Sequence, residues 1–167
     1  MKVVVGAGLI AIALGAVALG VSSHAAPTAS PLAGTWALVA ADVLHADGTR
    51  AHDYGETPKG LLIVDDGGRY SLQIFSPDRP HFASNDKTAG TPAEYKTASL
   101  GASTHFGILG IDSAGGTLTF KIDAASYPNW EGASQTRQYK LEGDELSYRG
   151  PPRPNGDVPI SIWRRLK

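Results

Sequence analysis

Arg137 is the residue of this sequence with the clearest potential for chemistry. It alternates with Tyr139 and Leu141 in the predicted strand 134–141, and residues two apart share one face of a strand. If that face points inward, the buried guanidinium needs an acceptor, because an unpaired buried charge is costly. The acceptor is either a carboxylate or phenolate of a ligand, held by charge-assisted hydrogen bonds, or an internal Asp or Glu. Both alternatives stay open at this point.

The histidines are the next candidates. Beyond position 25 they are His45, His52, His81 and His105, with no His-x-His or His-x-x-x-His pair, so we predict no metal site. His105 or His81 beside a carboxylate would allow acid–base catalysis. Either histidine could also be the single axial ligand of a haem. We nevertheless predict no cofactor. No Gly-x-Ser-x-Gly nucleophile motif occurs, and we assign no catalytic residue.

Aromatic and polar side chains complete the set that would line a binding cavity. Trp130 follows Pro128, which interrupts a strand, so we expect Trp130 at the mouth of the fold or beneath it, as a ligand lid or as a packed turn. The predicted ligand-binding residues are Arg137, Tyr139, Tyr70, Gln73, Phe75, Phe120, Trp130, Tyr148, His105 and His81. The apolar wall is expected from Phe75, Leu118, Phe120 and Ile122.

The elements that must position these side chains are mainly strands. Short apolar or alternating segments, which favour strands, fall at residues 36–45, 60–64, 69–75, 104–112, 117–124, 134–141, 145–148 and 158–166. Asp65-Asp66-Gly67-Gly68 predicts a tight hairpin turn. No strand–helix–strand alternation appears. We predict a single antiparallel up-and-down β-barrel of about eight strands, because closure removes exposed sheet edges.

One short helix interrupts the strands. Thr91, Pro92 and Glu94 form a capping box with proline in the first turn, and the helix should end near Gly101. The loop at 76–90 before it is long for a compact domain. It either covers the cavity as a lid or simply leads into the helix.

The start of the chain has the pattern of an export signal. A positive Met1-Lys2 precedes the uncharged run 3–21, and Ser23 and Ala25 form the small-x-small pattern of a cleavage site. We predict an exported protein, periplasmic or secreted, with no stable membrane span after cleavage. The alternative is a membrane anchor formed by an uncleaved leader, since this run is just long enough to cross a bilayer. The predicted organisation is a signal peptide at 1–25, a linker at 26–31 and one domain at 32–167.

The composition of the predicted exported part excludes several functions. Removing residues 1–25 leaves 142 residues, the size of one domain. These carry 14 Lys or Arg and 16 Asp or Glu, so no basic surplus predicts nucleic-acid binding. The chain has no Cys, which excludes disulfides and a thiol nucleophile.

Five motifs carry a resemblance to a known family. In order they are GTW at 34–36, TPAEY at 91–95, PNWEG at 128–132, LEGDEL at 141–146 and WRR at 163–165. In this order the chain resembles the bacterial and fungal lipocalin-like domain family, over about residues 32–167. The resemblance implies a small calycin-type barrel with a central cavity and no single activity. It also implies that Arg165 stacks on Trp36, with Trp163 on the same strand face, to close the barrel.

We therefore expect an exported lipocalin-like protein that binds a small hydrophobic or amphipathic molecule in its barrel. One alternative is an enzyme of the cyclase or isomerase type that uses the same cavity. Another is an envelope structural or interaction barrel with a filled interior. The oligomeric state is not predicted.

Overall fold

The computed structural model describes residues 1–2 and 30–167. The predicted signal peptide, apart from its first two residues, and most of the predicted linker lie outside the described residues. The strands are β1 Gly34–Leu44, β2 Arg50–His52, β3 Lys59–Val64, β4 Arg69–Phe75, β5 Ala102–Asp112, β6 Thr117–Ala125, β7 Ser134–Glu142, β8 Glu145–Arg149 and β9 Val158–Arg165. The helices are α1 Pro92–Leu100 and the short 3₁₀ turn η1 Pro128–Trp130.

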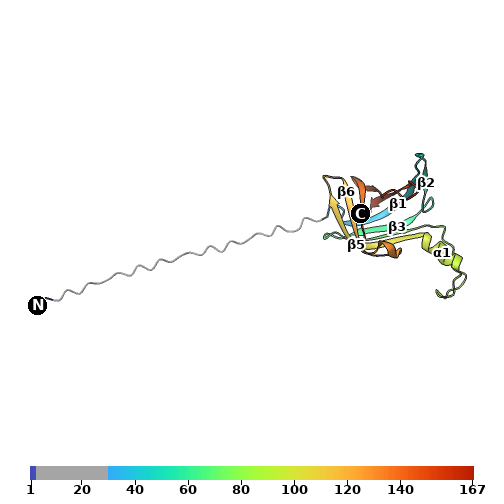
Figure 1. Cartoon of the computed structure of the whole chain (residues 1–167), viewed down its shortest axis with the longest axis horizontal. Coiled ribbons are helices and arrows are strands. Elements are labelled where there is room, and N and C mark those ends of the chain that lie inside the picture. The colour runs from blue at the N-terminus through green and yellow to red at the C-terminus, as the bar shows by residue number, and fades with distance from the viewer. Residues whose placement is uncertain (3–29) are drawn as a thin grey trace.

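The strands form one antiparallel sheet that closes on itself. Its order is β2-β1-β3-β4-β5-β6-β7-β8-β9, and β1 also pairs with β9 (Figure 1). Eight strands make the barrel, and β2 adds to the second half of β1 at Leu44↔Arg50 and its neighbours. The predicted mainly β, up-and-down barrel with one helix is confirmed.

The hairpin predicted at 65–68 joins β3 and β4. The backbone N–H of Asp65 donates to the carbonyl of Arg69 at 2.9 Å, and Gly68 donates back to Asp65 at 3.0 Å. Gly68 has a φ of +81°, a left-handed conformation that glycine adopts without a steric cost. The turn chemistry therefore sets the register of this strand pair.

A bulge in β1 separates a closed end of the barrel from an open one. The register against β9 shifts between Leu38 and Ala40, and a bulge bends the strand that carries it. Before the bulge β1 pairs with β3, from Gly34↔Val64 to Ala37↔Leu61. After it, β1 pairs with β2 instead. The barrel wall therefore opens between β1 and β3 at one end.

The closed end is filled with side chains. The alternation predicted for β6 is present, with Leu118, Phe120 and Ile122 facing inward at 0–2% exposure. The largest fully buried side chains are Trp36, Trp163, Phe120, Leu32, Leu62, Leu72, Leu118, Leu146 and Val64. An eight-stranded barrel is just wide enough for its interior to be filled in this way.

Trp36 and Arg165 close that end. The Arg165 guanidinium carbon lies 4.0 Å from the centroid of the Trp36 ring, which is the stacking expected from the resemblance. The Trp36 indole N–H donates to the carbonyl of Leu32 at 2.9 Å. Gly34 is needed here because its φ of +127° is strained for other residues, and a Cβ at its position would also lie only 3.1 Å from Nη1 of Arg165. The first motif of the chain thus serves barrel closure.

The helix α1 stands away from the barrel wall (Figure 1). Its capping box is formed: the Thr91 hydroxyl accepts from the N–H of Glu94 at 3.3 Å, and the Glu94 carboxylate accepts from the N–H of Thr91 at 2.7 Å. No residue of α1 is buried, because its sequence offers no apolar face. Among the described residues, no helix is long and apolar enough to cross a membrane.

Candidate functional site

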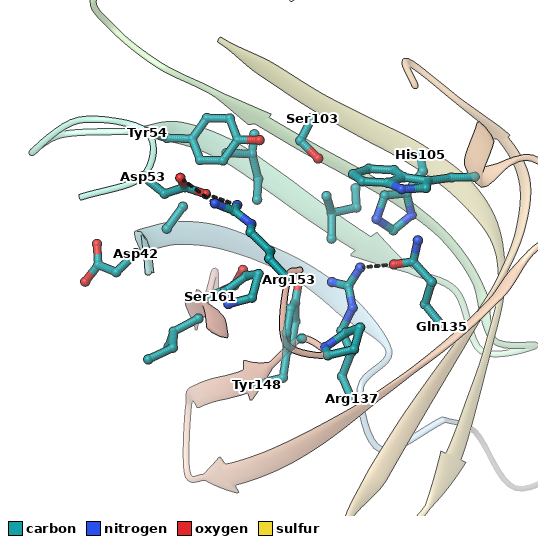
Figure 2. A pocket seen from close by; sticks show the side chains of 18 of the residues that line it. Asp42, Asp53, Tyr54, Ser103, His105, Gln135, Arg137, Tyr148, Arg153 and Ser161 are labelled. Atoms are coloured by element: carbon teal, nitrogen blue, oxygen red, sulfur yellow. Dashed lines mark hydrogen bonds and ion pairs between the residues drawn. The ribbon is translucent and has the colours of Figure 1, made fainter. Parts of the chain in front are cut away.

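A cavity of about 320 Å³ occupies the open end of the barrel (Figure 2). This volume is near the lower limit of ligand sites, which span about 300–1,000 Å³. The wall comes from β1, β4, β5, β7, β8 and β9, and it is completed by Tyr54, Trp130 and the segment 150–153. The interior is therefore filled at one end and hollow at the other, which disfavours the hypothesis of a filled barrel.

Arg137 projects into this cavity between aromatic rings. Strand β7 alternates strictly between exposed and half-buried residues, and Arg137 is on the inward face. Its guanidinium carbon lies 4.3 Å from the centroid of Phe120 and 5.0 Å from that of Tyr148. Its Nη2 donates to Oε1 of Gln135 at 2.8 Å (Figure 2). Aromatic faces attract a cation, so the rings hold the guanidinium without neutralising it.

The charge of Arg137 has no carboxylate partner within the described part of the chain. Seven ion pairs occur between described residues, and none includes Arg137. An internal Asp or Glu, one of the two acceptors expected from the sequence, therefore does not pair with Arg137 among residues 30–167: the cavity-lining Asp42 and Asp53 pair with Arg50, His52 and Arg153 instead. The neighbouring amide of Gln135 is a neutral acceptor and leaves the positive charge uncompensated.

One polar atom of Arg137 and one of its neighbour Tyr148 lack hydrogen-bond partners. Among the described residues, Nε of Arg137 and the hydroxyl of Tyr148 are buried without a hydrogen bond. Burial raises the pKa of Tyr148, while the nearby Arg137 opposes that shift. The phenol therefore stays protonated and offers an O–H donor. Buried donors without acceptors are destabilising by about 1–3 kcal/mol each, so these two groups lower the stability of the ligand-free protein.

His105 lines the cavity as a neutral ring. Its Nδ1 lies 2.7 Å from the hydroxyl oxygen of Tyr70. Burial, together with the smaller effect of the Arg137 charge, lowers the pKa of His105 to about 3. Burial also raises the pKa of Tyr70. The partner of His105 is thus a phenol and not a carboxylate, so His105 does not form the acid–base pair that would favour the enzyme alternative.

The segment Gly150–Asp157, here called the mouth segment, closes one side of the cavity. Gly150, Pro151, Pro152 and Arg153 line it directly. Arg153 forms an ion pair with Asp53. Nδ1 of His45 lies 2.9 Å from Oδ1 of Asp157. The segment is therefore held at two points, one of which depends on a histidine.

We expect the His45–Asp157 pair to make the mouth segment sensitive to pH. The hydrogen bond to Asp157 raises the pKa of His45 above its ordinary 6.5, and the same bond lowers the pKa of Asp157 below its ordinary 3.8. Because the pKa of His45 is raised, its protonated ring stabilises the contact fully below about pH 6.5, and this stabilisation disappears as the pH rises through the raised pKa. Because the pKa of Asp157 is lowered, its carboxylate stabilises the contact above about pH 3.8, and this stabilisation disappears as the pH falls through the lowered pKa. We expect the segment to be held best between these limits.

Amide hydrogen exchange of the mouth segment, corrected for intrinsic rates, should therefore be slower at pH 5.5 than at pH 8. His45→Gln should remove that difference, because the glutamine keeps a polar side chain but does not titrate. His52→Gln is the matched control, since His52 contacts Asp42 and not the mouth segment. A pH dependence that persists in His45→Gln would show that another group holds the segment.

The structure gathers some of the predicted residues and separates others. Arg137, Trp130, Tyr148 and His105 line the cavity. Phe120 lies beneath Arg137, and Tyr70 contacts the cavity only through His105. Tyr139 packs against the core and does not line the cavity.

Three predicted residues lie elsewhere, which corrects the expectation that they line the cavity. In β4 the buried face carries Tyr70, Leu72 and Ile74. Gln73 and Phe75 are on the opposite, outer face, because strand side chains alternate. His81 is exposed in the segment before α1. No residue of 76–101 lines the cavity, so the lid interpretation of the 76–90 loop is also wrong.

Other lining residues were not predicted. Gln135 shares the face of Arg137 two positions away, and strand alternation alone would have identified it. Ser103 and Ser161 lie at inward positions of β5 and β9 that carry no apolar pattern. Tyr54 and Arg153 lie in connections between strands, where periodicity gives no information.

Comparison with known proteins gives one family and two similar structures. The model of the lipocalin-like domain matches residues 33–165. A lipocalin-like protein from Bacteroides uniformis is 18% identical, with 81% of this chain and 98% of that chain covered and a TM-score of 0.43. A mutant of the fluorescent protein UnaG is also 18% identical, with 81% and 96% covered and a TM-score of 0.37. No curated protein matches the sequence.

Proposed function

This chain belongs to the lipocalin-like domain family, and from that premise we propose that its barrel binds a small apolar molecule with an acidic group. The observation that carries the proposal is Arg137. Its guanidinium is held inside the cavity by aromatic rings and has no carboxylate partner among residues 30–167. A ligand carboxylate would supply the missing negative charge and accept hydrogen bonds from the N–H groups at the end of the guanidinium that do not donate to Gln135.

The remainder of the cavity suits the apolar part of such a molecule. Leu72, Ile74 and Trp130 also line the cavity and offer apolar surface. Burial of apolar ligand surface contributes about 25 cal/mol per Å², while the acidic group sets the orientation. Charge-assisted hydrogen bonds contribute about 1.5–3 kcal/mol each, so the acid should dominate selectivity.

Binding of a matched acid and amide tests the proposal. Phenylbutanoate is a small straight-chain acid with a terminal phenyl ring, chosen for a cavity of about 320 Å³, and phenylbutanamide has nearly the same shape without the charge. We expect isothermal titration calorimetry at pH 7 to show at least about tenfold tighter binding of the acid, from one charge-assisted hydrogen bond of about 1.5 kcal/mol. Equal affinity for acid and amide, or no binding of either, would contradict the proposal.

We also propose that the protein acts outside the cytoplasm. The support is the positive, apolar and small-residue pattern of residues 1–25. Production of the full chain in bacterial cells should give a mature protein that begins at Ala26 by N-terminal sequencing. Recovery of the protein only in membranes, still beginning at Met1, would instead support the uncleaved anchor.

A further inference from the structure

The polar wall of the cavity carries more donors than one acidic group can use. We propose that the ligand has a neutral oxygen acceptor, a keto carbonyl, near its acidic group, and that His105 binds this oxygen through Nε2–H. The inference rests on the proposed binding of an acid at Arg137. It adds the second polar group of the ligand and therefore narrows the ligand class to apolar keto acids.

The proton on the His105 ring can be assigned by counting hydrogen bonds. The hydroxyl of Tyr70 contacts Nδ1 of His105 at 2.7 Å, and it has no other partner among the described residues. If the ring donated to Tyr70, the phenolic proton would be buried without an acceptor, which is unfavourable. The hydroxyl therefore donates to Nδ1, and the single proton of the neutral ring lies on Nε2.

The Nε2–H group faces a place for a ligand. His105 lines the cavity, and Nε2 makes no hydrogen bond to any described residue. Burial holds the ring neutral, with the pKa of His105 at about 3, so the group remains a donor at physiological pH. An uncharged donor suits an uncharged oxygen, whereas the guanidinium of Arg137 suits the anion.

Gln135 extends the donor wall between these two groups. Its Oε1 accepts from Arg137 at 2.8 Å, so the amide N–H groups are the part left to contact a ligand. Gln135 and Arg137 are two residues apart on β7, a Cα separation of about 7 Å. Figure 2 shows the side chains of Arg137, Gln135 and His105 near one another on one side of the cavity. Donors spread over this length fit two oxygen groups better than one carboxylate.

Phenylbutanoate and its α-keto derivative form the pair that tests the inference, because they differ only by the ketone oxygen. We expect wild-type protein to bind the keto acid about 3- to 10-fold more tightly, the ratio given by one neutral hydrogen bond. His105→Phe keeps an aromatic ring and should bind both acids with equal affinity. Gln73→Ala, on the outer face of β4, is the control and should keep the wild-type preference.

A measurement on the wild-type protein covers the case in which His105→Phe does not fold. The ¹⁵N-coupled Nε2–H signal of His105 should be visible by NMR and should shift on addition of the keto acid, and much less on addition of phenylbutanoate. No preference for the keto acid, or a proton found on Nδ1, would overturn the inference and leave acid binding intact. Failure of both acids to bind would overturn the proposed function and the inference together.

Discussion

Trp36→Ala should destabilise the protein more than any other single truncation in the closed end, by about 3–5 kcal/mol in urea unfolding. The indole is fully buried, so its removal eliminates its apolar contacts and leaves a cavity. It also loses the hydrogen bond to the carbonyl of Leu32 and the stacking of Arg165. The pairing of β1 with β9, which closes the barrel, depends on this packing.

Trp130→Ala is the matched control for that experiment. Trp130 is half-buried and borders the cavity, so its removal enlarges a space that already exists. We expect a loss below about 2 kcal/mol, within the usual range for a partly exposed residue. Equal losses for the two variants would mean that Trp36 is not a principal support of the closed end.

The parts of the fold that repeat at short range were predictable from the sequence. The alternation of Leu118, Phe120 and Ile122 identified β6 and its inward face, and the Asp–Gly turn at 65–68 identified the β3–β4 hairpin. Closure by Arg165 on Trp36 followed from the family resemblance. The first two features depend on residues that are neighbours in the sequence. The third depends on one pairing, that of Trp36 in β1 with Arg165 in β9.

Other features depend on contacts that the sequence does not encode locally. Strand β2 has three exposed residues and pairs with the part of β1 that β3 leaves free. Gln73 and Phe75 were assigned to the wall with Tyr70, although an odd separation places them on the other face of β4. The ion pair of Arg153 with Asp53 joins residues 100 positions apart, and no local pattern predicts it.

The two ends of the barrel meet different physical demands. The closed end is apolar and filled, and it supplies the free energy of folding through burial. The open end keeps a charged guanidinium and several unpaired donors, which lowers the stability of the ligand-free protein. Such a cost is common at binding sites, where groups are arranged for a ligand and not for the free fold.

Arg137→Met should separate these two roles in one variant. Methionine has a similar length and suits the aromatic surroundings formed by Phe120 and Tyr148. Loss of one charge-assisted interaction of about 1.5–3 kcal/mol should weaken phenylbutanoate binding by roughly 10- to 100-fold. Replacement of an unpaired internal charge by an apolar side chain is often neutral or stabilising. We therefore expect the ligand-free variant to be as stable as wild type, or up to about 2 kcal/mol more stable in urea unfolding.

Arg164→Met is the control, because Arg164 lies on the outer face of β9 and pairs with Glu145 at 3.6 Å on the surface. It should leave acid affinity unchanged and alter stability by less than about 1 kcal/mol, as exposed ion pairs do. Unchanged acid affinity in Arg137→Met would show that the guanidinium is not the anchor. A loss of several kcal/mol of stability in that variant would show that its charge is compensated within the protein. A higher free energy of unfolding together with weaker acid binding in Arg137→Met is the result expected of an arginine that serves the ligand and not the fold.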